Sequence, residues 1–152
     1  MEEQCLSLQI SDQQENVQLL EKQQGLLRSL FCRNVAFEDT GGGEPSGAVA
    51  LAIIREFGSY ERFKIDFTKS VVGIQGSGWV ALAYCKTENR LLIMEIERYY
   101  ANIYPLFVIL MVVDVFANTC CDDCKNDRVE LIEAFWNLVN WDEVNKRFDA
   151  II

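Results

Sequence analysis

The sequence predicts an α+β domain in which helices come first and last and a group of strands lies between them. Two observations support this class. Helical periodicity runs up to about residue 73 and returns after residue 127, and three apolar runs typical of strands lie between. With 152 residues, the chain has the length of about one domain.

The first predicted element is an amphipathic helix over residues 6–31, whose apolar residues recur mostly at spacings of three, four or seven. A connector follows at residues 34–47, NVAFEDTGGGEPSG, because three consecutive glycines cannot continue a helix. We therefore divide the chain into a short N-terminal helical arm, residues 1–40, and a main domain, residues 41–152.

Two further helices are predicted before the strands. Residues 46–57, SGAVALAIIREF, have the pattern of a helix, and Ser59 is a predicted N-cap for the next one. Phe63, Phe67 and Val71 then recur every four residues, which places them on one face of that helix.

Three apolar runs predict three strands, at residues 79–85, 90–96 and 106–116. The first two are separated by KTEN, a turn of hairpin size. The third is nearly unbroken and rich in β-branched residues, as in a strand buried on both faces. It is too short to span a membrane as a helix and contains Asp114, so no membrane span is expected.

The C-terminal region, residues 127–152, has the pattern of two helices that meet at Asn140 and Trp141. Asn140 is a residue type that caps helices, and Asp142 follows it in the first turn. This completes the order helices, strands, helices.

Composition excludes several classes of function. The 14 basic residues against 23 acidic ones give a net charge of -9, which argues against a nucleic-acid partner. The chain has no histidine, so it cannot supply an imidazole base or a histidine ligand to a metal. The first residues have no basic region before an apolar core, so we expect no secretory signal.

The cysteines offer one candidate site of their own. The chain has six, which we expect to be reduced thiols. In CCDDC, Cys120, Cys121 and Cys124 have spacings that could share a helix face and ligate zinc, with Asp114 or Cys85 as a further ligand. The alternative, ordinary thiols, is favoured because this is not zinc-finger spacing and the neighbouring acids raise thiol pKa.

Four blocks of sequence together resemble one known family. They are GGGEPSG at 41–47, FGSYERFK at 57–64, VGIQGSGW at 72–79 and KNDRVELIEAFWNLVNWDEVNKRF at 125–148. In this order they resemble the iron/manganese superoxide dismutases, and VGIQGSGW is closer to the mitochondrial manganese branch. The resemblance implies a C-terminal domain with a three-stranded antiparallel sheet flanked by helices. It also implies that the family's N-terminal helical hairpin is truncated here.

The resemblance also implies where a metal would bind. The family holds manganese or iron with three histidines and one aspartate. Asp114 matches the aspartate, whereas Asn118 and Val35 stand where histidines would be. Trp79 matches a tryptophan of the outer shell. The expectation is therefore a degenerate site without a resident cofactor, or with manganese or iron only if the site is completed from elsewhere.

Two functions follow as expectations. In the first, the protein has lost superoxide dismutation and acts as a structural or interaction protein, as in a mitochondrial assembly, with cytoplasmic location as the alternative. It would then bind a protein partner through the surface left by the missing hairpin. In the second, it is a working dismutase whose ligands are completed by another chain.

Overall fold

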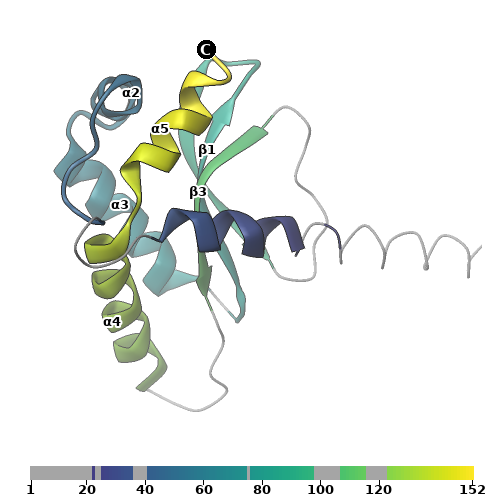
Figure 1. Cartoon of the computed structure of the whole chain (residues 1–152). Coiled ribbons are helices and arrows are strands. Elements are labelled where there is room, and N and C mark those ends of the chain that lie inside the picture. Colours follow the sequence, from purple (N-terminus) through teal and green to yellow (C-terminus); the bar gives the residue numbers. More distant parts are fainter. Residues whose placement is uncertain (1–21, 23–24, 36–40, 75, 98–106, 116–122) are drawn as a thin grey trace, which may run out of the picture.

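The computed structural model describes residues 22, 25–35, 41–74, 76–97, 107–115 and 123–152, without the side chains of 97 and 123–127. It confirms the α+β class: helices pack against a three-stranded antiparallel sheet (Figure 1). Residues 25–34 form a helix, the N-terminal helix. The other elements, in chain order, are α2 (Ala48–Phe57), α3 (Tyr60–Gly73), β1 (Gly78–Cys85), β2 (Arg90–Glu97), β3 (Phe107–Val115), α4 (Asp123–Leu138) and α5 (Trp141–Asp149).

The N-terminus of α3 is capped by the residue just before it, whereas that of α2 is capped by a side chain from another helix. The Ser59 hydroxyl accepts the N–H of Arg62 at 3.1 Å, so the predicted cap of α3 is confirmed. Helix α2 has Gly47 at its N-cap position and no cap from its own segment. Instead, the N–H of Val49 donates to Oδ1 of Asn145 at 3.1 Å, so a side chain of α5 satisfies this helix end.

The three predicted strands form one sheet of order β2-β1-β3, with β1 antiparallel to both neighbours. The KTEN turn joins β1 to β2, and its last residue, Asn89, has a φ of 53°. This is the left-handed conformation that asparagine tolerates better than most residues. β1 is buried along its whole length, and β3 is buried over most of its own.

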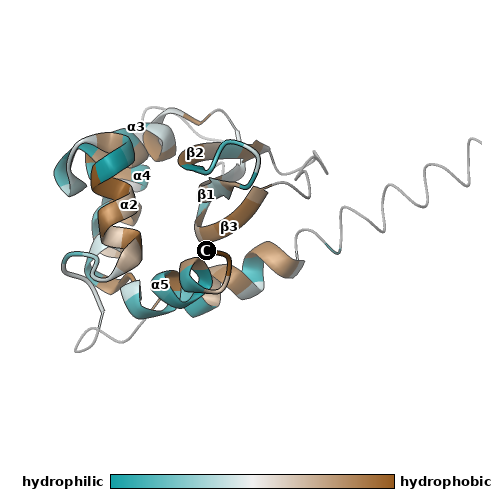
Figure 2. Cartoon of the chain, turned by 90° about the horizontal axis from the view of Figure 1, so that it is seen from above, coloured by the Kyte–Doolittle hydropathy of each residue, from teal (hydrophilic) through white to brown (hydrophobic). Residues whose placement is uncertain are grey.

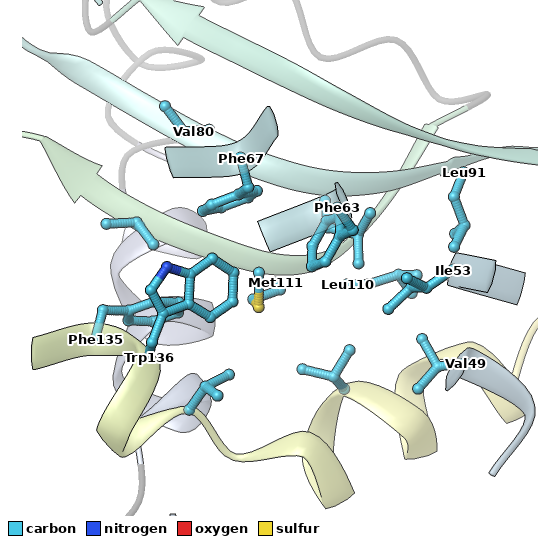
Figure 3. Close-up of a cluster of buried hydrophobic side chains, with 14 of the residues drawn as sticks. Val49, Ile53, Phe63, Phe67, Val80, Leu91, Leu110, Met111, Phe135 and Trp136 are labelled. Atoms are coloured by element: carbon cyan, nitrogen blue, oxygen red, sulfur yellow. The ribbon is translucent and has the colours of Figure 1, made fainter. Parts of the chain in front are cut away.

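One face of the sheet packs against α2, α3, α4 and α5 and forms the main core (Figure 3). Phe63 and Phe67 of α3 and Trp136 of α4 meet there, with ring centroids 5.5–6.0 Å apart. Leu110 and Met111 of β3 lie beneath them and are fully buried. Edge-to-face aromatic contacts of this kind add to the apolar burial that holds helices on the sheet.

The second face of the sheet is also apolar. Its buried residues, together with one from the N-terminal helix, form a separate cluster: Leu27, Trp79, Ala81, Ala83, Ile96, Ile109 and Val112. Seen from above, the N-terminal helix passes beside β3 and α5, across from α2, α3 and α4 (Figure 2). Leu27, together with the partly buried Leu30 and Phe31, thus packs this helix against the second face.

The junction between α4 and α5 agrees with the sequence pattern. Oδ1 of Asn140 accepts the N–H of Glu143 at 3.2 Å, so Asn140 caps α5 as expected. The Asn140 N–H also donates to the carbonyl of Asn34, which ties the junction to the end of the N-terminal helix. Within the part of the chain described, no helix is both long and apolar enough to cross a membrane.

Candidate functional site

Asp114 lies one residue before the end of β3, as the resemblance led us to expect. Val113 and Val115 face the main core, so strand alternation turns Asp114 toward the second face. Its partner across the ladder is Trp79 of β1. Asp114 is 6% exposed, which is rare for a carboxylate.

In the described part of the chain, a cluster of apolar side chains lies on the same face of the sheet as this carboxylate. Trp79 and Val112 are fully buried there, and Leu27 of the N-terminal helix packs into the same cluster. Among the residues described, no group of three or more His, Cys, Asp or Glu side chains could hold a metal ion. One carboxylate is a single hard oxygen ligand, so this donor set does not fit a firmly held manganese or iron ion.

The structure does not bring Val35 to Asp114. Val35 forms an isolated antiparallel bridge with Val139 and packs against the main core. Asp114 points to the opposite face of the sheet, so positions 35 and 114 do not converge. Trp79, the expected outer-shell residue, does lie directly across the ladder from Asp114.

Most of the cysteines of the proposed zinc site lie outside the residues that the structure describes. Asn118, Cys120 and Cys121 lie outside the described residues, and Cys124 is described only as part of the backbone of α4. The zinc hypothesis therefore stays a prediction.

Cys85, considered as a further ligand, is placed clearly. It pairs with Phe107 at the far end of the β1–β3 ladder, whereas Trp79 and Asp114 pair at the near end. Cys85 is six positions further along the strand than Trp79, which is about 20 Å. Cys85 is buried and free, and it cannot join a site built on Asp114.

Two polar residues that bond the backbone of β3 at Leu110 and Val112, before Asp114, were missed by the sequence analysis. Asn34 is fully buried; its Oδ1 accepts the N–H of Val112 at 3.0 Å and its Nδ2 donates to the carbonyl of Leu110 at 3.5 Å. The Nη1 of Arg147 donates to the same Leu110 carbonyl at 2.8 Å. Both contacts join segments far apart in sequence, so no local pattern could have indicated them.

Besides Leu110, the guanidinium of Arg147 contacts two further residues. Its Nη2 donates to the carbonyl of Leu30 at 3.3 Å, and its Nε lies 3.5 Å from a carboxylate oxygen of Glu143. Burial lowers the pKa of Arg147; Glu143 opposes this shift and the nearby Arg33 adds to it. The guanidinium stays charged at all ordinary pH values, so its hydrogen bonds to backbone carbonyls are charge-assisted.

Arg128 of α4 has a similar role near Trp79. It donates to the carbonyls of Val72, Ile74 and Gly76, in the segment that leads from α3 into β1. The Val72 carbonyl lies in the last turn of α3, and those of Ile74 and Gly76 follow the helix, so none of the three is needed as an acceptor within the helix. Arg128 therefore fixes the segment that delivers Trp79 to the second face.

A hollow of about 600 Å³ lies elsewhere, between α3 and α4. Lys64 stands over the ring of Trp136, with Nζ 5.5 Å from the ring centroid, and Trp136 donates to the Thr68 hydroxyl at 3.1 Å. These helices cover the main core, so the hollow is separated from Asp114 by the sheet. Its lining is Lys64, Ile65, Thr68, Lys69, Ile132, Glu133, Trp136 and Asn137.

The family is settled by comparison with known proteins. Residues 45–147 match the iron/manganese superoxide dismutases, C-terminal domain. With the sheet and flanking helices described above, this defines the class of protein: the chain belongs to the iron/manganese superoxide dismutase family.

Some of the similar relatives are named for iron and others for manganese. The chain is 46% identical over 126 residues to a superoxide dismutase [Fe] of Methanothermobacter marburgensis, covering 83% of this chain and 62% of the relative. It is 44% identical over 127 residues to that of Methanothermobacter thermautotrophicus, covering 84% and 62%. A superoxide dismutase [Mn] of Corynebacterium diphtheriae is 39% identical over 122 residues, covering 80% and 60%.

The matched region spans about three fifths of the length of these relatives. The family prediction is therefore confirmed. The mitochondrial manganese branch, the truncated hairpin and the division at residue 40 stay predictions.

Proposed function

We propose that this chain is a member of the family that does not dismutate superoxide by itself and acts as a structural or interaction protein. One observation carries the proposal. The chain keeps the family's fold and an aspartate at the end of β3, yet it contains no histidine at all. The fold is retained without the nitrogen ligands that the family's chemistry uses.

The physical argument concerns ligand number and type. A redox ion must be held in two oxidation states at a fixed potential, which needs several strong ligands and a supporting set of hydrogen bonds. Among the residues described, the second face offers the Asp114 carboxylate in an otherwise apolar cluster. A single carboxylate exchanges such an ion with solvent, so catalysis by this chain alone is not expected.

A protein partner belongs to the same proposal. As a non-catalytic subunit, the chain would act through its surface in a larger assembly. We propose a mitochondrial assembly, with the cytoplasm as the alternative. Exposed apolar side chains support contact with another protein: Leu51 is 71% exposed and Ile54 is 50% exposed on α2.

The test is metal content together with superoxide removal. The chain is produced with added manganese and iron, alongside one of the named relatives as a positive control, and both are analysed for metal and for activity. We expect the chain to contain far less than one metal per molecule and to remove superoxide at the background rate. Asp114→Ala is expected to change neither result.

The contrary outcome is equally clear. Stoichiometric manganese or iron with fast superoxide removal, both lost in Asp114→Ala, would overturn the proposal. Since the chain lacks histidine, that result would mean that another chain completes the site. Metal and activity that appear only after a second protein is added would also mean that another chain completes the site.

A further inference from the structure

Strand β3 contains one residue more than its partner β1. Leu82 pairs with Met111 and the next residue, Ala83, pairs with Ile109, so Leu110 is the extra residue of a β-bulge. Leu110 and Met111 are both fully buried in the main core, although they are consecutive. Two consecutive side chains of β3 therefore face the same side of the sheet here, and the regular alternation between the two faces starts again after Leu110.

The bulge at Leu110 determines which face of the sheet the Asp114 side chain lies on. Ile109 before the bulge and Val112 after it both belong to the cluster on the second face. Asp114, two residues beyond Val112, shares that face and lies across from Trp79. If the same residues alternated without a bulge from Ile109 onward, Asp114 would turn into the main core and its carboxylate would be buried among apolar side chains.

Two side chains hold the bulge from the outer edge of β3. The carbonyl of the extra residue, Leu110, accepts from Nη1 of Arg147 at 2.8 Å and from Nδ2 of Asn34 at 3.5 Å. Oδ1 of Asn34 accepts the N–H of Val112 at 3.0 Å. The amide of Asn34 thus engages a C=O and an N–H two residues apart, as a neighbouring strand would.

This edge has no strand beside it among the residues described, because the sheet order is β2-β1-β3. Arg147 also bonds the Leu30 carbonyl, so one guanidinium joins α5, β3 and the N-terminal helix. Its planar fork can reach two carbonyls of different elements at once, which a lysine ammonium does less well. Its side chain is only 12% exposed, so water does not easily replace these bonds.

We propose that Asn34 and Arg147 are positioning residues that hold the bulge of β3 and thereby aim Asp114 at the second face. This rests on the proposed function only in taking Asp114 as the acid of the family's site. Neither residue touches a ligand in this role; both act on the backbone that carries Asp114.

The test uses the isotope-labelled full-length chain and nuclear magnetic resonance. Two signals are followed: the nuclear Overhauser effect between the Asp114 β-protons and Trp79, and amide exchange at Val112. Directly opposed residues have Cβ atoms about 5 Å apart, within range of this effect. The variants are Arg147→Met and Asn34→Asp. The matched control is Arg55→Met, because Arg55 also bonds a backbone carbonyl, that of Asn89, in the β1–β2 turn.

We expect Arg147→Met to weaken the Asp114–Trp79 effect and to speed exchange at Val112 roughly fivefold or more, relative to Leu82 of β1 in the same sample. Arg147→Lys should restore part of this protection. Asn34→Asp keeps an acceptor for Val112 but loses the donor to Leu110, so it should weaken the Asp114–Trp79 effect with less change at Val112. Arg55→Met should leave both signals as in the wild type.

Unchanged signals in Arg147→Met would overturn the proposal. Equal acceleration at Val112 and Leu82 would also overturn it, because it would show general destabilisation. If Arg147→Met does not fold, Arg147→Lys and Asn34→Asp decide the question by the same signals. These readouts need neither metal nor activity. A chain that removes superoxide would refute the proposed function and leave this inference standing. Unchanged signals in the variants would refute this inference and leave the proposed function standing.

Discussion

Single polar side chains complete hydrogen bonds between distant parts of this molecule. Oδ1 of Asn145 caps α2. Gly47, just before α2, has a φ of 75°, and a Cβ there would lie 2.9 Å from atoms of the Asn145 side chain, so position 47 favours glycine. Tyr60 and Trp141 both donate to the carbonyl of Gly43, at 3.3 and 3.1 Å. The glycine-rich segment before α2 is thus a turn held by surrounding side chains.

Tyr60 gives a prediction at this scale. Burial, and then the charge of Glu44, raise the pKa of Tyr60 from 10.0 to about 12, against a lowering effect of Trp141. Between pH 10 and 12 the folded protein therefore holds a proton that the unfolded chain has lost, so stability falls as pH rises through this range. We expect the wild type to lose more stability between pH 9 and 12 than Tyr60→Phe, as measured by urea unfolding at each pH. A parallel decline in wild type and Tyr60→Phe would show that Tyr60 titrates normally in the folded protein.

The N-terminal helix is the element whose attachment matters most to the candidate site. It contributes Leu27 to the second face, ends in the buried Asn34, and is bonded to α5 through Arg147. Its neighbouring leucines differ sharply, since Leu27 is 0% and Leu26 is 57% exposed.

This contrast supplies a matched pair of variants. Leu27→Ala should lower the free energy of unfolding by about 2–5 kcal/mol, because it removes a fully buried side chain and leaves a cavity. Leu26→Ala should change it by less than about 0.5 kcal/mol. Denaturant unfolding of both measures the difference. Two small and equal effects would mean that the helix is not packed on the sheet in solution.

Patterns of neighbouring residues in the sequence were enough to predict the helices and strands, but not the contacts that build the candidate site. Ser59 and Asn140 were predicted as caps because capping depends on a few adjacent residues. The three strands followed from their apolar runs, but the order β2-β1-β3 and the extra residue at Leu110 depend on pairing between strands. Asn34 contacts β3 across 76 and 78 residues of sequence, a separation at which no periodicity operates.

At the scale of the whole molecule, charge is the dominant property. A net charge of -9 at pH 7 makes the compact state repel itself. Salt shortens the range of this repulsion from about 30 Å at 0.01 M to about 10 Å at 0.1 M. We therefore expect the melting temperature to rise as sodium chloride is increased from about 0.01 to 0.1 M.

A less acidic variant is the control. Glu130→Gln with Glu133→Gln changes two exposed positions of α4 and takes the net charge from -9 to -7. Its melting temperature should rise less over the same salt range. A melting temperature that falls with salt would show that attractive ion pairs outweigh the net repulsion.

The bond between Arg147 and the Leu30 carbonyl has a consequence for how the protein is made. The two residues are 117 positions apart, so at 5–20 residues per second the ribosome adds Arg147 roughly 6–23 s after Leu30. Until Val115, the last residue of β3, is added, the apolar side of the N-terminal helix, with Leu27, Leu30 and Phe31, has no finished sheet to pack against. A newly made chain therefore presents this surface to chaperones and to other nascent chains before it presents any folded site.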